Sequence, residues 1–180
     1  MQHAYISCMD DDRLANLVGA LALALTDAQA AAMAEASGLS QSAAAAVMML
    51  GTNDGITIEA LSRILGLSHS ATVRAVERLH ADGLVARVER DDRREVGLGL
   101  TRAGGRLRRK LTEARFHALG QALAGLGAED RKPLEALVSR LLDQVTGGRV
   151  EADHICRLCD EAVCTAATCP VEQKALRQES

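Results

Sequence analysis

The sequence predicts a mainly helical fold with one small β-hairpin. Apolar residues make up 48% of the chain but aromatic residues only 1%, so the core must consist of Leu, Val, Ala and Met, a composition that favours helices. Apolar side chains also recur at spacings of three and four along most of the chain. Residues 85–100 differ, because two short apolar runs flank a charged turn, which is typical of a hairpin.

The first helix is expected over residues 13–35. Its apolar face consists of Leu14, Leu17, Val18, Leu21, Leu25 and Ala28. The acidic run 10–12 just before it suits the positive N-terminal end of a helix dipole. The apolar run 14–25 is shorter than the roughly 18 to 20 residues that span a bilayer, so we expect a cytoplasmic protein. A second, Ala-rich helix is expected over residues 40–50.

Residues 57–85 contain two helical patterns separated by the turn Gly66-Leu67-Ser68, with Ser68 placed as an N-cap. Two short helices joined by a tight turn form a helix-turn-helix. The runs 85–90 and 95–100 then flank the sequence DDRR and predict a hairpin with a charged tip. A helix-turn-helix followed directly by a hairpin is the winged-helix arrangement.

From Thr101 the apolar spacing is again helical as far as Leu126, and a last helix is expected to start at Pro133 and to reach Val145. Gly147-Gly148 then leads into the tail. These helices carry more apolar surface than a small winged-helix core can cover. We therefore expect them to pack against a second copy of the chain.

The net charge of −3 conceals a basic middle section. Residues 68–115 contain 12 Lys and Arg against 7 Asp and Glu, a local charge of +5. On charge alone, an ordinary solvated surface is the preferred interpretation, because a local excess of this size is common. The sequence lacks a Gly-rich phosphate loop, a G-x-S-x-G motif and an H-E-x-x-H motif, which argues against an enzyme.

The string LSRILGLSHSATVRAVERLHADGLVARVERDDRREVGLGLTRAGGRL resembles the multiple antibiotic resistance regulator (MarR) family of bacterial transcription factors. The shared features are LGLS-x-S-x-TV, the D-R-R of the wing and LT-x-x-G, all in order. The resemblance implies a winged helix-turn-helix with interlocking N- and C-terminal dimerisation helices. It divides the chain into an N-terminal arm and dimerisation helix (1–35), a DNA-binding domain (36–100), C-terminal dimerisation helices (101–150) and a four-cysteine tail (151–180) outside the family core.

The resemblance also implies which residues contact double-stranded DNA. The family's recognition helix matches residues 68–80, and its wing aspartate and arginine match two residues of the DDRR tip. The implied DNA-binding residues are Ser68, Ser70, Thr72, Arg74, Arg78, Asp92 and Arg94. An exposed recognition helix offers such side chains to base edges and phosphates, and a wing arginine reaches the minor groove. Arg78 is equally compatible with an ordinary surface or ion-pair role.

Four of the five cysteines lie within fourteen positions: Cys156, Cys159, Cys164 and Cys169, spaced C-x2-C-x4-C-x4-C. In a cytoplasmic protein this density favours a metal site over structural disulfides. Four thiolates complete a tetrahedral zinc site or hold an iron–sulfur cluster, and the spacing does not separate these two cofactors. Reactive or regulatory thiols are the alternative. His154 is an alternative ligand in place of one thiolate, but a histidine just outside a closed four-cysteine set more often orients a ligand or faces solvent.

The sequence as a whole predicts a dimeric transcription regulator of the MarR type, acting as a repressor on a near-palindromic operator. A metal centre, a cluster or the redox state of the thiols is expected to modulate it. Because the tail follows the last dimerisation helix, the expected route is a change in the separation of the two DNA-binding domains. The 14-residue segment that carries the four cysteines is expected to have no apolar core of its own. The rival hypothesis is a redox or metal-handling protein that keeps a winged-helix scaffold without specific DNA binding. Nothing in the sequence marks a small-molecule effector pocket.

Overall fold

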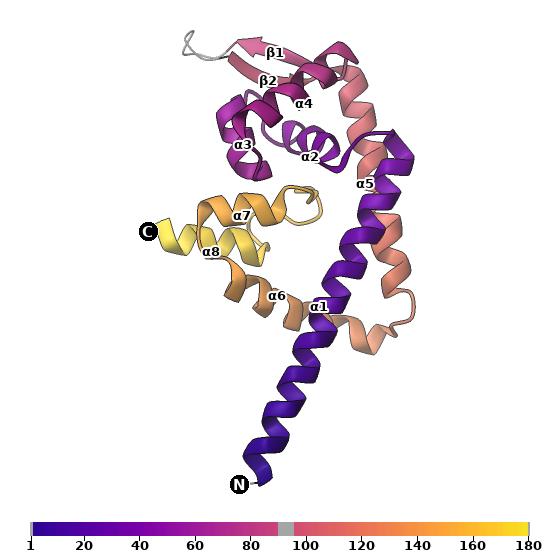
Figure 1. Cartoon of the computed structure of the whole chain (residues 1–180), viewed down its shortest axis with the longest axis vertical. Coiled ribbons are helices and arrows are strands. Elements are labelled where there is room, and N and C mark those ends of the chain that lie inside the picture. The colour runs from indigo at the N-terminus through magenta and orange to yellow at the C-terminus, as the bar shows by residue number, and fades with distance from the viewer. Residues whose placement is uncertain (1, 90–95, 180) are drawn as a thin grey trace.

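The computed structural model describes residues 2–89 and 96–179 of the chain. Its elements, in order, are α1 (Gln2–Ser37), α2 (Gln41–Leu50), α3 (Ile58–Leu65), α4 (His69–Ala81), β1 (Val85–Glu89), β2 (Val96–Leu100), α5 (Arg102–Leu123), α6 (Ala128–Val145), α7 (Arg149–Cys156) and α8 (Pro170–Glu179). Figure 1 shows α2, α3, α4 and the two strands gathered at one end, with α1 and α5 running away from them side by side. The predicted mainly helical fold with a small β-wing is confirmed.

Local capping explains the two helices of the helix-turn-helix. The Thr57 hydroxyl accepts a hydrogen bond from the backbone N–H of Ala60 at 3.2 Å and so begins α3. Gly66 ends α3 with a φ of 65°, a left-handed conformation that glycine adopts without steric cost. Ser68 then caps α4 by accepting from the backbone N–H of Ala71 at 3.3 Å. The turn predicted from Gly66-Leu67-Ser68 is therefore confirmed.

The wing is an antiparallel pair whose register runs from Val85 opposite Leu100 to Glu89 opposite Val96. An isolated bridge between Ile56 and Leu98 attaches this hairpin to the segment before α3. Beneath the hairpin lies the main apolar core, to which α2, α3, α4, β2 and α5 contribute. Its most deeply buried members include Val47, Leu50, Leu61, Leu79, Leu98 and Leu111. The winged-helix region (residues 41–100) is thus held on one core, which fixes the direction of α4.

Helix α1 begins earlier than predicted. It starts at Gln2, so the acidic run 10–12 lies inside the helix and does not precede it. An 18-residue window within Asp11–Ser37 has a mean hydropathy of 1.5, so this helix is long and apolar enough to cross a membrane by length and composition alone, although the uninterrupted apolar run 14–25 is shorter than a span. In the fold, α1 instead packs along α5. A helix of a soluble protein that is buried between subunits is apolar to a similar degree.

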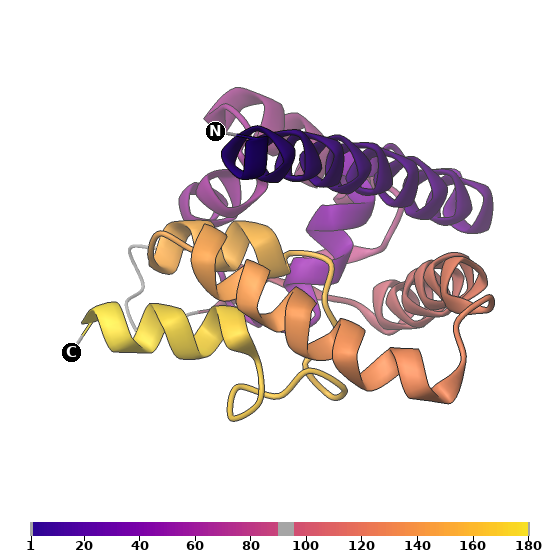
Figure 2. The same ribbon diagram turned by 90° about the horizontal axis from the view of Figure 1, so that it is seen from below.

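Helix α6 begins at Ala128 and contains Pro133 in its interior, so the prediction that Pro133 starts the helix is wrong. Glu129 and Asp130 occupy the first turn, where acidic side chains favour the helix dipole. None of its described residues is buried. Figure 2 shows α6 lying apart from α1, although the two helices overlap in projection in Figure 1.

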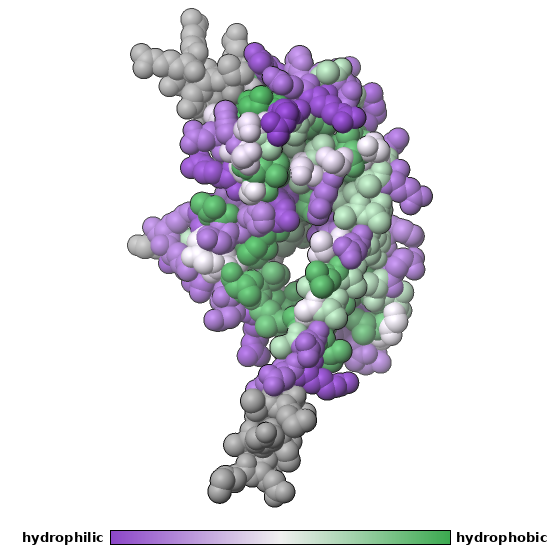
Figure 3. All heavy atoms as spheres, in the orientation of Figure 1, coloured by the Kyte–Doolittle hydropathy of each residue, from purple (hydrophilic) through white to green (hydrophobic). Residues whose placement is uncertain are grey.

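Large apolar side chains remain exposed on α1 and α6. On α1 these are Leu14, Leu17, Val18, Leu21 and Leu23, and on α6 they are Leu137, Val138, Leu141 and Val145. Figure 3 shows apolar residues gathered around the opening between these two parts of the chain. A monomer would leave this surface in water, which matches the expectation that a second copy covers it.

After α6 the chain turns back toward the winged-helix region. Helix α8 packs on α6 and α7, and α7 packs on α3 (Figure 1). We call residues 149–179, which comprise α7, the loop that carries two of the cysteines and α8, the cysteine module. The sequence predicted a tail beyond the last helix, whereas the structure has a small helical unit that contacts the helix-turn-helix.

Candidate functional site

The outward face of α4 is polar and basic. Ser68, Ser70, Arg74 and Arg78 are all exposed, as the sequence predicted. Val76 and Leu79 on the inner face are 5% and 0% exposed and anchor the helix to the core. Within the described residues no carboxylate forms a salt bridge with Arg74 or Arg78, so the intramolecular ion-pair role considered for Arg78 has no partner there.

The prediction that Thr72 is an exposed DNA-contacting residue is wrong. Its side chain is 0% exposed, and its hydroxyl donates to the carbonyl oxygen of Ser68 at 3.2 Å. Thr72 lies one turn after the N-cap and faces the core together with Val76 and Leu79. Its side chain therefore fixes the first turn of α4 and does not reach out of it. The family pattern alone does not distinguish a residue that packs the recognition helix against the core from one that the helix exposes to DNA.

The two wing residues Asp92 and Arg94 lie outside the described residues. The strands on either side are formed as predicted, and Glu89 and Val96 are the last paired positions before the tip. The minor-groove role of Arg94 stays a prediction.

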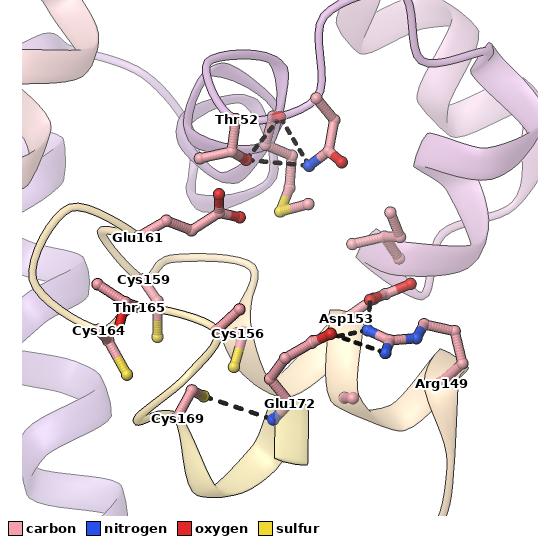
Figure 4. A pocket seen from close by; sticks show the side chains of 15 residues that line it. Thr52, Arg149, Asp153, Cys156, Cys159, Glu161, Cys164, Thr165, Cys169 and Glu172 are labelled. Atoms are coloured by element: carbon pink, nitrogen blue, oxygen red, sulfur yellow. Dashed lines mark hydrogen bonds and ion pairs between the residues drawn. The ribbon is translucent and has the colours of Figure 1, made fainter. Parts of the chain in front are cut away.

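The four cysteines of the module line one cavity of about 390 Å³ (Figure 4). Cys156 ends α7, Cys169 immediately precedes α8, and Cys159 and Cys164 lie on the loop between these helices. The opposite wall comes from the winged-helix region and includes Met49, Thr52, Asn53 and Ile64. Folding has therefore brought all four predicted thiols to one place, and that place adjoins the DNA-binding half of the molecule.

The thiols influence one another's ionisation. The Cys156 thiol donates to Cys159, which lowers the pKa of Cys159 to about 6 against the effect of burial, and the charge of Arg115 on α5 acts in the same direction. The same contact raises the pKa of Cys156, as do burial and the neighbouring Cys169. Burial, followed by contact with Cys169, raises the pKa of Cys164 to about 11. The four sulfur atoms thus form one connected set.

The described residues contain no group of three or more His, Cys, Asp or Glu side chains already arranged to hold a metal ion. All four thiols named here are free. The predicted ligands therefore share a cavity without forming a finished coordination sphere. Two of them lie on the loop, whose backbone is tied mainly by local turns such as Cys164 N–H to Asp160 O at 2.9 Å.

A charged cluster ties the two helices of the cysteine module together. The Arg149 guanidinium donates to both carboxylate oxygens of Glu172, at 2.7 and 2.9 Å, and also to Asp153 and Glu179. Such paired contacts are among the stronger hydrogen bonds in proteins. They lower the pKa of Glu172 and raise that of Arg149. The sequence analysis missed this cluster because its members are up to 30 positions apart.

The cysteine module also has an apolar core. Ala152, Cys169, Val171 and Ala175 are buried in it, and Leu142, Ile155, Cys156 and Cys164 pack against them. Only Cys169 of these buried residues lies within the cysteine segment 156–169, which was expected to have no apolar core of its own; the other three come from the flanking helices α7 and α8. Because the apolar residues are few and Ala-rich, their spacing in the sequence was too weak a signal to show this core.

His154 does not face the cysteines. Its Nδ1 donates to the carbonyl oxygen of Ile64 at 2.7 Å, in the last turn of α3. The last carbonyls of a helix have no partner within it, so this contact caps α3 from outside. No sequence signal could have identified this pairing, because the two residues are 90 positions apart.

Comparison with known proteins finds relatives of the winged-helix region. Residues 37–95 match the sequence model of the MarR family. Over this segment the chain is similar to MarR-family regulators. The HTH-type transcriptional regulator PetP of Rhodobacter capsulatus is 36% identical over 102 residues, which cover 52% of this chain and 59% of PetP. The MarR match thus falls on the helix-turn-helix and the start of the wing, the part whose geometry is described above.

Solved structures confirm the winged-helix fold. RV1404 from Mycobacterium tuberculosis aligns with a TM-score of 0.65 at 22% identity, over 74% of this chain and 92% of RV1404. YusO from Bacillus subtilis aligns with a TM-score of 0.61 at 20% identity, over 75% and 94%. A MarR-family regulator from Silicibacter pomeroyi aligns with a TM-score of 0.55 at 26% identity, over 69% and 87%. Between 69% and 75% of this chain thus matches most of each of these three structures.

Proposed function

We propose that the protein is a cytoplasmic, homodimeric regulator of transcription that binds a near-palindromic DNA operator and acts as a repressor. The observation that carries this proposal is the face of α4, where Ser70, Arg74 and Arg78 are exposed on a helix anchored by buried Val76 and Leu79. A helix presented in this way fits the major groove, and its arginines can pair with guanine edges or phosphates. The match of residues 37–95 to the MarR family and the similarity to PetP, a transcriptional regulator, support the same proposal.

Dimerisation follows from the apolar surfaces of α1 and α6. On α6, Leu141 is 54% exposed and Val145 is 65% exposed. Burying such surface against a second copy is favourable by about 25 cal/mol per Å². A two-fold dimer presents two α4 helices, which accounts for a near-palindromic site.

A DNA-shift assay on a fragment library, with competitor DNA present, tests the proposal. A regulator retains a defined subset of fragments when non-specific sites are in excess. Retention that competitor DNA abolishes for every fragment would instead favour the rival hypothesis of a redox or metal-handling protein on a winged-helix scaffold.

Substituting Arg74 and Arg94 separately should give different losses. Arg74→Ala removes a side chain of the recognition face, so we expect about 1–3 kcal/mol of weaker binding at the preferred fragment and reduced discrimination among related sequences. Arg94→Ala removes a wing contact that reads backbone and groove shape, so affinity should fall similarly for many sequences. Titrating both variants against the same fragments at fixed salt measures this difference. Unchanged affinity in the Arg94 variant would contradict the wing assignment.

A further inference from the structure

The cysteine module is attached to the turn of the helix-turn-helix. The Ile64 carbonyl that accepts from His154 at 2.7 Å lies two residues before Gly66, which ends α3, and four residues before Ser68, which caps α4. The His154 ring also packs so closely that a Cβ added at Gly66 would lie 3.4 Å from it. Helix α7 therefore contacts the residues that set how α4 leaves the turn.

A second contact lies on the other side of Cys156. Leu158 packs against the main core of the winged-helix region and lines a small hollow with Met33 and Leu39, at the junction of α1 and α2. His154 and Leu158 thus hold the chain against the DNA-binding domain both before and after Cys156. Any rearrangement of the thiol set that shifts Cys156 must strain or move one of these two contacts.

The chemistry of the cavity selects its ligand. Four thiols from one short segment meet there, and thiolates are soft ligands that prefer Zn²⁺ or iron–sulfur clusters over hard cations. Cys169 is buried in the small core and Cys156 and Cys164 pack against it, whereas Cys159 lies on the loop outside this core. Because Arg149 already ties α7 to α8, a ligand needs only to draw the loop inward and does not have to fold the whole module.

We propose that Cys156, Cys159, Cys164 and Cys169 bind one thiolate-preferring metal centre, and that its occupancy changes DNA affinity through α7 and the contact between His154 and the helix-turn-helix. The first half concerns the metal alone, while the second half rests on the proposed function. The route differs from the one expected from the sequence, because the module contacts α3 directly. In this route the metal changes the position of α4 within its own subunit, and it does not have to change the separation of the two subunits.

Metal content is measured on the full chain purified without oxygen. The expected result is one zinc per chain, or iron with matching sulfide and a visible absorbance band, and its loss in the Cys159→Ser, Cys164→Ser double variant. Cys8→Ser, which changes the one cysteine outside the set, should keep the metal. Reloading metal-free protein with Zn²⁺ alone, or with ferrous iron and sulfide, separates the two sources. A parent that holds neither metal in stoichiometric amount overturns the site.

The regulatory half is tested with a preferred DNA fragment. The loaded and metal-free parent should differ in affinity by about tenfold, which corresponds to about 1.4 kcal/mol. His154→Ala should keep its metal but lose this difference, and His154→Asn, whose amide N–H can replace Nδ1, should restore it. A His154→Ala protein that folds, shown by an unchanged thermal unfolding profile, and retains the full difference would overturn the route.

The two proposals fail in different ways. If the parent retains no specific fragment in either metal state, the proposed function fails and the metal content still decides the site by itself. If the parent binds DNA specifically and equally tightly with and without metal, DNA binding stands and the regulatory half is overturned.

Discussion

Leu141→Asp is expected to convert the dimer into a monomer and to weaken specific DNA binding by at least about a hundredfold. Leu141 lies on the exposed apolar face of α6, near Leu137 and Val145, and is 54% exposed in the single chain. A carboxylate there would be buried without a partner when two copies meet, which costs several kcal/mol per subunit. Because both subunits carry the substitution, this cost to the free energy of dimerisation applies twice.

Ala136→Asp is the matched control. It introduces the same residue into the same helix at an exposed position away from the apolar face. Light scattering should give a dimer mass for the control and a monomer mass for Leu141→Asp, while circular dichroism should show both folded. A Leu141→Asp protein that stays dimeric would place the interface elsewhere on the chain.

Gly104→Ala is expected to destabilise the fold by about 2–4 kcal/mol, at or somewhat above the usual cost of overpacking. Gly104 lies in the first turn of α5, and a Cβ built there would be 2.1 Å from the carbonyl oxygen of Leu84 and 3.1 Å from Leu100. The contact is with backbone, so relief requires α5 to move away from the start of the wing.

Gly105→Ala, at the adjacent position, is expected to have the opposite effect on stability. A Cβ at Gly105 would meet nothing within 4 Å, so alanine should raise stability by about 0.5–1 kcal/mol through helix propensity. Urea unfolding followed by circular dichroism measures both variants. Equal changes in the two would show that close packing of α5 against Leu84 does not limit the fold.

The helix-turn-helix and wing could be predicted from the sequence because their signals are local. Gly66 and Ser68 fix one helix end and the next helix start, and alternation around a charged tip fixes the hairpin. The orientation of individual side chains was less predictable. Thr72 matches the family pattern, but its side chain is buried, and its hydroxyl donates to the carbonyl oxygen of Ser68 in the first turn of α4.

The cysteine module was only half predictable. The spacing of the four cysteines identified them as a set, and the structure brings them into one cavity. The contacts that hold this set in place join residues distant in sequence, such as His154 with Ile64 and Arg149 with Glu172. Sequence periodicity reports local structure only, so neither pairing left a signal.

Footprinting of a retained DNA fragment, combined with the mass of the complex, tests the central claim that a two-fold dimer reads DNA with α4. The account predicts two protected half-sites about 10 bp apart, related by near-palindromic symmetry, with two chains on each duplex. One chain protecting a single half-site, or protection without sequence preference, would contradict it.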